Sequence, residues 1–183
     1  LCSESDNIAV FRFDISHFKQ VNDDFGFDVG DRVIVACYNI IKTNIEKYLI
    51  HAAIGRAHGD EFIVFAKAGN DEIEKTAQTI IRDMENYDFS SIGCKKQLGC
   101  YIGGLIGQRK TVADIRNMIE SSIEVINHAR KKGSNSIAIQ SYVLNGTSVD
   151  TPLGNIKFCL VSTLIFEGAF MLSGARRPDT LGH

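Results

Sequence analysis

The chain has 183 residues, of which 44% are hydrophobic and 23% are charged, and its formal net charge is -2. This composition is typical of one globular domain, and the near-neutral charge gives no sign of a nucleic-acid-binding surface. The five cysteines are scattered and form no C-x-x-C pair. This pattern argues against a disulfide framework or a zinc site, and it favours a reducing compartment.

The apolar periodicity predicts alternating strands and helices along the first 140 residues. The predicted order is β-α-α-β-β-α-β-α-β, at residues 8–13, 17–24, about 31–48, 50–54, 62–66, 71–84, 97–106, 111–132 and 136–139. A tight hairpin in the middle excludes a purely parallel sheet. We therefore expect an α+β fold with an antiparallel or mixed sheet and helices packed on its faces.

Glycines and caps refine these predictions. Gly26 and Gly30 indicate a turn before the second helix, and Gly103 with its neighbour Gly104 indicates a bulge or a close backbone approach. The segment 111–114 resembles a capping box that opens the last helix. Five periodic apolar residues are expected to form the inner face of that helix, which ends before Gly133: Val112, Ile115, Ile119, Ile123 and Ile126.

The predicted hairpin carries two adjacent carboxylates at its tip, Asp60 and Glu61, beside Gly59. Gly59 has no Cβ, so its backbone can lie close against a bound substrate. Carboxylates beside an open backbone suit Mg²⁺, which is usually held by one or two carboxylates together with substrate phosphates. Acidic residues are also common at solvated hairpin tips, so the hairpin by itself leaves both interpretations open.

A second acidic stretch lies upstream and favours the metal-binding interpretation over the solvated turn. It contains Asp14 at the end of a predicted strand, followed by Phe18, Lys19, Asn22, Asp23, Gly26, Gly30 and Asp31. Together with Arg56 and the Gly-Asp-Glu-Phe string at 59–62, this pattern resembles the GGDEF domain family, the diguanylate cyclases. The resemblance covers roughly residues 8–140. It implies a ferredoxin-like palm fold of the kind found in nucleotide cyclases and polymerase palms.

The resemblance implies an enzyme of bacterial second-messenger signalling that condenses two GTP molecules into cyclic di-3′,5′-GMP and pyrophosphate. Each 3′-hydroxyl would attack the α-phosphate of the other GTP, so two domains must face each other in a homodimer. Mg²⁺, or Mn²⁺ in its place, would be held by Asp14, the Ile15 carbonyl and Asp60. Glu61 would act as a further partner of the metal or of a lysine, or as a proton acceptor.

The same resemblance implies that Asn22 and Asp31 read the guanine base. An amide and a carboxylate can pair with the N1–H and N2–H₂ edge of guanine, which adenine lacks. Lys19 would neutralise phosphate, and backbone N–H groups around His17 and Phe18 would cradle it.

Several positions keep other interpretations open. Arg130 stands where the family usually has a lysine that faces the γ-phosphate, but residues 130–132 equally fit complementation of the helix dipole. Asp31 likewise fits a first-turn acid. His58 replaces the first glycine of the signature, and Ser134 replaces a phosphate-binding arginine. The alternative is a degenerate domain that binds GTP and regulates a neighbouring domain.

We expect residues 1–140 to form this domain and residues 141–183 to be a C-terminal extension. The family's usual opening segment is missing, so the sequence is expected to belong to a longer protein with an upstream sensor domain. The domain would be cytoplasmic, with or without a membrane anchor upstream. The apolar run 158–172 is shorter than the ~20 residues of a membrane span, and we interpret it as a packed extension or a tail without evolved structure.

The family's product-inhibition motif, Arg-x-x-Asp, would fall at Leu49 and Ala52. Neither residue matches, which predicts no feedback inhibition through that site.

Overall fold

A computed structural model describes residues 7–108 and 111–142. Their helices and strands follow the predicted order, with a short 3-10 helix, η2, added before the fourth strand. The elements are β1 (Asn7–Ile15), α1 (Phe18–Phe25), α2 (Phe27–Tyr48), β2 (Ile50–His58), β3 (Glu61–Lys67), α3 (Asn70–Asn86), η2 (Phe89–Ile92), β4 (Cys100–Gln108), α4 (Val112–Lys132) and β5 (Ser136–Ser141).

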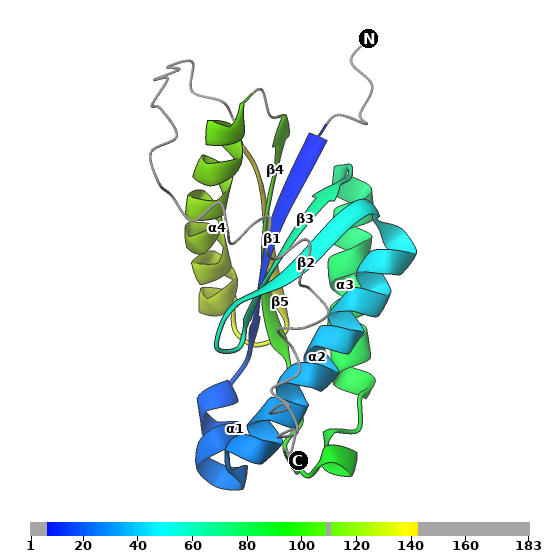
Figure 1. Cartoon of the computed structure of the whole chain (residues 1–183), viewed down its shortest axis with the longest axis vertical. Helices are drawn as coiled ribbons and strands as arrows, with labels where there is room; N and C mark the ends of the chain where they lie inside the picture. Colours follow the sequence, from blue (N-terminus) through cyan, green and yellow to red (C-terminus); the bar gives the residue numbers. More distant parts are fainter. Residues whose placement is uncertain (1–6, 109–110, 143–183) are drawn as a thin grey trace, which may run out of the picture.

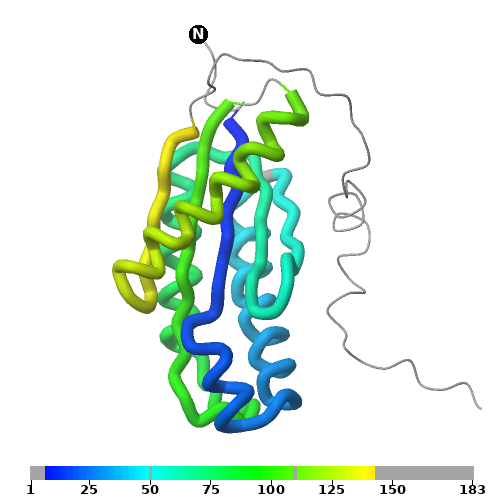
Figure 2. Tube along the Cα trace, turned by 90° about the vertical axis from the view of Figure 1, so that its left-hand side faces the viewer, coloured from blue at the N-terminus to red at the C-terminus, as the bar shows by residue number. Residues whose placement is uncertain are grey.

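The strand β1 lies at the centre of a five-stranded sheet with the order β2-β3-β1-β4-β5. It is antiparallel to β3 and to β4, and β2 is antiparallel to β3. The strand β5 runs parallel to β4, and α4 supplies the crossover that a parallel pair requires. The helix α4 covers one face of the sheet, while α2 and α3 cover the other (Figures 1 and 2). The predicted α+β fold with a mixed sheet is confirmed.

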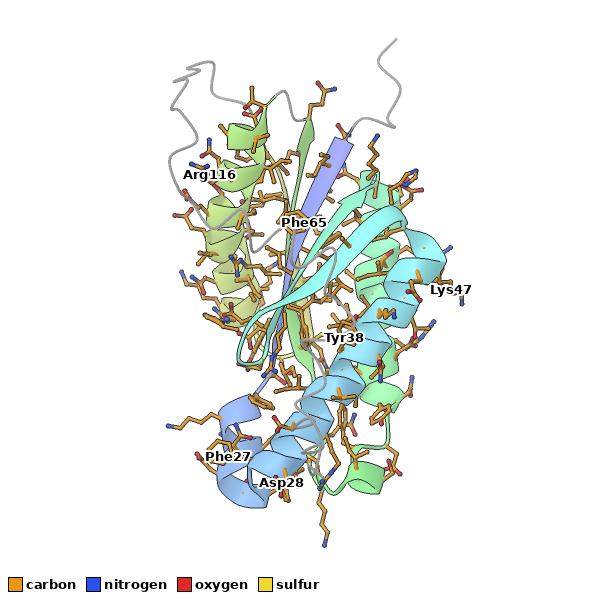
Figure 3. The ribbon with its side chains drawn as sticks, viewed as in Figure 1. Phe27, Asp28, Tyr38, Lys47, Phe65 and Arg116 are labelled. Carbon is orange, nitrogen blue, oxygen red and sulfur yellow. The ribbon has the colours of Figure 1, made fainter. Side chains whose placement is uncertain are left out.

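Because β1 is covered on both faces, it has apolar partners on both. Phe11 belongs to the core on the α2 and α3 side, whereas Val10 belongs to the core under α4. Tyr38 of α2, labelled in Figure 3, packs against the larger core. Its ring centroid lies 6.2 Å from that of Phe62 of β3. Because β1 is packed on both faces, the position of its last residues, including Asp14, is well fixed.

The strand β4 and the helix α4 approach each other very closely at Gly103. A Cβ at this position would lie 2.4 Å from the backbone nitrogen of Ile126. Gly104 faces the other side of the sheet, where a Cβ would lie 3.1 Å from the ring of Phe11. The predicted close approach is confirmed, and the register between β1 and β4 is continuous, so these glycines do not mark a bulge.

The predicted start of the second helix is wrong. The helix α2 begins at Phe27, so Gly30 lies inside it, and the acid in its first turn is Asp28 rather than Asp31. Gly30 serves packing between two helices, because a Cβ there would lie 1.9 Å from the side-chain oxygen of Asn22.

The predicted inner face of α4 is also wrong in part. Val112 and Ile123 are exposed, and the residues that α4 buries are Met118, Ser122, Val125, Ile126 and Ala129. Ile126 is buried as predicted. The buried face also contains the polar Ser122 and the small Ala129, which a search for large apolar residues does not select. The capping box is confirmed, since the amide of Thr111 donates to Asp114 and the amide of Asp114 donates back to the Thr111 hydroxyl. Gly133 caps the other end.

Within the ranges 7–108 and 111–142, no helix is both long enough and apolar enough to cross a membrane. The apolar run 158–172 lies outside the described residues.

Candidate active site

The predicted acidic residues meet where β1 ends and the β2–β3 hairpin turns. The strand register sets Asp14 directly opposite Glu61. Gly59 has φ +54, a left-handed conformation that a glycine adopts without strain, and it makes the tight turn just before Asp60. The Arg56 side chain closes this turn by donating from Nε to the Gly59 carbonyl at 2.6 Å. The structure therefore brings the two acidic stretches of the sequence together.

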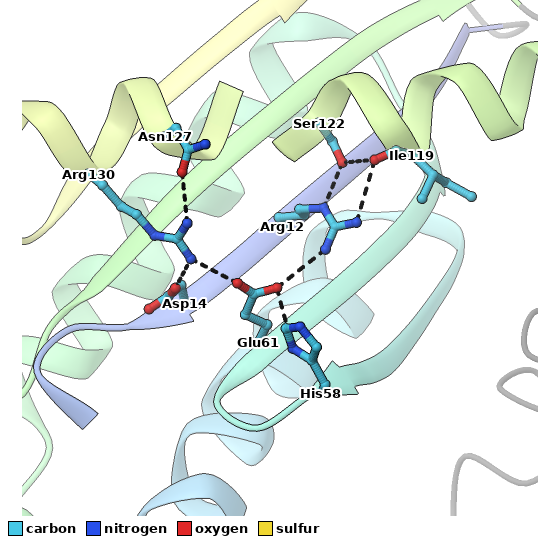
Figure 4. A network of polar contacts seen from close by, with 8 residues as sticks. All are labelled: Arg12, Asp14, His58, Glu61, Ile119, Ser122, Asn127 and Arg130. Carbon is cyan, nitrogen blue, oxygen red and sulfur yellow. Dashed lines mark hydrogen bonds and ion pairs between the residues drawn. The ribbon is translucent and has the colours of Figure 1, made fainter. Parts of the chain in front are cut away.

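Two carboxylates directly opposite each other on neighbouring strands repel. Arg130 of α4 offsets this repulsion, because its Nη2 donates to Glu61 Oε1 at 2.8 Å and also to Asp14 Oδ2 (Figure 4). Asn127 accepts from Nη1 of the same guanidinium at 2.8 Å. The basic end of α4 thus contacts the acidic cluster directly, which complementation of the helix dipole alone would not require.

A second guanidinium, that of Arg12, lies on the inner side of the cluster. It was not predicted from the sequence as a site residue. Arg12 precedes Asp14 by two residues and therefore lies on the same face of β1. It is 9% exposed, and its Nη1 lies 3.4 Å from Glu61 Oε2. Its position could have been noticed in the sequence, because Arg12 is a charged residue inside the otherwise apolar strand Ile-Ala-Val-Phe-Arg-Phe.

Burial raises the pKa of Asp14, against the hydrogen bond from Arg130, which lowers it. Burial also raises the pKa of Asp60, and the nearby charge of Asp14 raises it further. For Arg130, burial lowers the pKa, but the hydrogen bonds to Asp14 and Glu61 outweigh it and raise the pKa overall. Carboxylates with perturbed pKa values that gather in one place are typical of functional sites.

The oxygen atoms of Asp14 and Asp60 are of the kind that Mg²⁺ prefers. Among the residues that the structure describes, no three or more His, Cys, Asp or Glu side chains are grouped so as to hold a metal ion. Two carboxylates are the number that Mg²⁺ commonly uses when substrate phosphates and water supply its remaining ligands. Ile15, whose carbonyl is the third predicted ligand, directly follows Asp14 at the end of β1.

The predicted base-reading residues Asn22 and Asp31 lie on α1 and α2. The helix α1 lies below the turn of the β2–β3 hairpin in Figure 1. The amide of Asn22 packs against Gly30, the residue before Asp31, in space that a Cβ would fill. The ring of Phe18 approaches the same point, 3.3 Å from where that Cβ would stand. Asp31 and Lys19 are exposed. The structure thus brings Asn22 beside the turn of α2 that carries Asp31.

The predicted phosphate cradle lies at the start of α1. His17 has φ 60 and ψ 23, and no side-chain hydrogen bond caps the helix that follows. The first N–H groups of a helix without such a cap are suited to an anion. Ser16, just before this turn, is buried and accepts hydrogen bonds at 3.0 Å from the Gly99 amide and from the Ser134 hydroxyl. Ser134 therefore supports this turn in the described structure.

His58, the departure from the glycine signature, fits its backbone position. The positive φ in this turn belongs to Gly59, and His58 is not among the non-glycine residues with positive φ. Its side chain is 78% exposed, and Nδ1 lies 3.6 Å from Glu61 Oε2. His58 therefore stands at the solvent edge of the carboxylate cluster.

Comparisons with known proteins identify the family to which the chain is similar. The family model described as "Diguanylate cyclase, GGDEF domain" matches residues 2–136. The chain is 27% identical over 143 residues to the probable diguanylate cyclase DgcT of Escherichia coli K12, covering 74% of the chain and 30% of that protein. It is 30% identical over 123 residues to the probable diguanylate cyclase DgcC of the same strain, covering 67% of the chain and 32% of that protein. The chain spans about a third of the length of these relatives.

A solved structure supports the fold. The active GGEEF domain of a diguanylate cyclase from Vibrio cholerae matches with a TM-score of 0.63 and 23% identity. The match covers 73% of this chain and 82% of that chain.

Proposed function

The chain belongs to the GGDEF domain family of diguanylate cyclases, and we propose that it condenses two GTP molecules into cyclic di-3′,5′-GMP with release of pyrophosphate. The observation that carries this proposal is the strand register that sets Asp14 opposite Glu61, with Asp60 beside them at the hairpin turn. Acidic side chains gathered at one point are the usual means of holding a metal–nucleoside triphosphate for in-line displacement.

In this proposal Asp14, Asp60 and the Ile15 carbonyl would hold Mg²⁺. Mg²⁺ bound there would neutralise charge on the triphosphate and make the attacking 3′-hydroxyl easier to ionise. Each oxygen of Glu61 already faces a guanidinium, since Oε1 contacts Arg130 and Oε2 contacts Arg12. These contacts favour a role for Glu61 as a partner of arginines over a role as proton acceptor.

The substrate would be selected on α1 and α2. Asn22 and Asp31 would pair with the guanine edge, and ATP would leave the Asp31 carboxylate without its donors. Lys19 and the uncapped N–H groups near His17 and Phe18 would neutralise and orient the phosphates. Support comes from the packing of Asn22 beside the α2 turn that carries Asp31.

The reaction needs two domains, because each domain would hold one GTP whose 3′-hydroxyl must reach the α-phosphate of the other. We therefore propose a homodimer as the working form, with an upstream sensor domain controlling its formation. Because a dimer forms in proportion to the square of monomer concentration, the specific activity would rise with protein concentration.

The test is an assay of purified protein with Mg²⁺ and GTP, following pyrophosphate release and the nucleotide products over a range of protein concentrations. Asp60→Ala is expected to abolish formation of the cyclic dinucleotide. Glu120→Ala, which removes an exposed carboxylate of α4, is the matched control and should keep wild-type activity. Product formation that survives in Asp60→Ala would overturn the assignment of the site.

A second function is favoured by the position of Arg130, whose guanidinium contacts Asp14 and Glu61 in the described structure. A domain held in this state would bind GTP without turnover and regulate a neighbouring domain. GTP binding without product at any protein concentration would support this alternative. His58→Gly would then show whether the histidine at the edge of the cluster prevents turnover.

A further inference from the structure

Arg12 is a charged residue in an apolar layer. Alternation along β1 sends it to the α4 side of the sheet, the side on which Val10, Leu105 and Met118 form a buried cluster. A charge in such a place is costly unless it is paired and hydrogen-bonded. Its contacts therefore indicate what the residue does.

Those contacts tie Arg12 to α4 on one side and to Glu61 on the other (Figure 4). Its Nε donates to the Ser122 hydroxyl at 2.9 Å, and Nη2 lies 3.5 Å from the Ile119 carbonyl. Ser122 is fully buried and donates in turn to the Ile119 carbonyl at 2.6 Å. With two of its nitrogens directed at α4, the third, Nη1, faces Glu61 Oε2.

The two arginines that face Glu61 differ in their freedom. The side chain of Arg130 is 34% exposed, so a bound phosphate can compete for its guanidinium. The side chain of Arg12 is 11% exposed and anchored to α4, so it has no comparable route to a ligand. If Arg130 turned to a phosphate, Arg12 would remain to hold Glu61 opposite Asp14.

We propose that Arg12 is a positioning residue: it holds Glu61 from the core side of the sheet, so that the opposed carboxylates keep their geometry when a metal–nucleotide complex binds. This inference rests on the proposed function and assigns to it a residue outside the signature. Arg12 acts through Glu61 and does not itself touch the substrate. Without it, repulsion from Asp14 would push Glu61 out of place.

The experiment measures the affinity of the protein for the Mn²⁺ complex of a GTP analogue with a methylene α–β bridge, by isothermal titration calorimetry. Arg12→Met is expected to lower this affinity by about 10-fold, the lower end of the range found when groups that orient a metal site are removed, because Arg12 acts through Glu61 and does not contact the metal ligands. Arg12→Lys should restore part of the loss, because an ammonium keeps the charge but lacks the planar fork. Arg82→Met removes an exposed arginine that pairs with Asp83 and should leave the affinity unchanged.

Ser122→Ala tests the positioning role without changing charge. It removes the acceptor of Arg12 Nε and is expected to lower the affinity in the same direction as Arg12→Met, by a smaller factor. If Arg12→Met does not fold, as judged by circular dichroism, Ser122→Ala decides. Wild-type affinity in a folded Arg12→Met would overturn the inference while leaving the proposed function intact. If Arg12→Met does not fold, wild-type affinity in Ser122→Ala would do the same. A wild-type protein that does not bind the Mn²⁺ complex would overturn both.

Discussion

Replacing Gly103 by alanine is expected to force α4 away from the sheet. The new Cβ would lie 2.4 Å from the backbone nitrogen of Ile126 and 2.5 Å from its Cα. Ordinary van der Waals contact begins near 3.4 Å, so the helix would have to move by about 1 Å. No change of rotamer can relieve this clash, because the obstacle is backbone.

The cost follows from this geometry. Overpacking a well-filled core costs about 1–3 kcal/mol, and a backbone obstacle places Gly103→Ala in the upper part of that range. The lower chain entropy of alanine returns about 0.5–1 kcal/mol, which leaves a net loss of about 2 kcal/mol. In urea, with a slope of about 2 kcal/mol/M, the midpoint should fall by about 1 M with an unchanged slope. Binding of GTP should also weaken, because α4 carries Ser122 and Arg130.

Gly104→Ala is the matched control, one residue further along the same strand. Its Cβ would meet ring carbons of Phe11 at 3.1 and 3.2 Å, and a side chain can yield where a backbone cannot. Its midpoint should therefore fall less than that of Gly103→Ala. Equal midpoints for the two variants, or a wild-type midpoint for Gly103→Ala, would refute the argument that α4 is held in place by this close approach.

Arg130→Met should lower the free energy of unfolding by about 1–3 kcal/mol at pH 7 and weaken GTP binding, because two opposed carboxylates lose their shared cation. Arg130→Lys should lose less stability, and equal urea midpoints for wild type and both variants would contradict this. Asp60→Asn should unfold at higher urea than wild type near pH 7, because burial raises the pKa of Asp60 in the folded state and the charged form is disfavoured there. The gain should shrink as the pH falls and vanish below about pH 3, where Asp60 is protonated in both states, and a gain that grows towards acid pH would show the sign to be wrong. Added cyclic di-GMP should not inhibit the initial rate below substrate-competitive concentrations, because Leu49 is buried and Ala52 carries no charge where the inhibitory motif has Arg and Asp; a titration that shows stronger inhibition would refute this.

The local signals in the sequence were sufficient for the elements and for part of the site. An apolar run that ends at Asp14, and a glycine between two apolar runs before Asp60 and Glu61, predict a strand and a hairpin without reference to the rest of the chain. These features depend on side-chain alternation and turn conformation over a few residues. The order of elements and the acidic ends of β1 and the hairpin could therefore be predicted, and the described structure contains both.

Only the tertiary structure decided the contacts between residues that are far apart in the chain. Gly30 suggested a turn in the sequence, but it makes room for Asn22, and Gly103 makes room for the backbone of α4. Arg12 and Arg130 meet at Glu61 from 49 and 69 residues away. Local periodicity cannot specify such contacts, because they exist only once the strand order places β1 beside β3 and the close packing of α4 brings its polar side chains to the cluster.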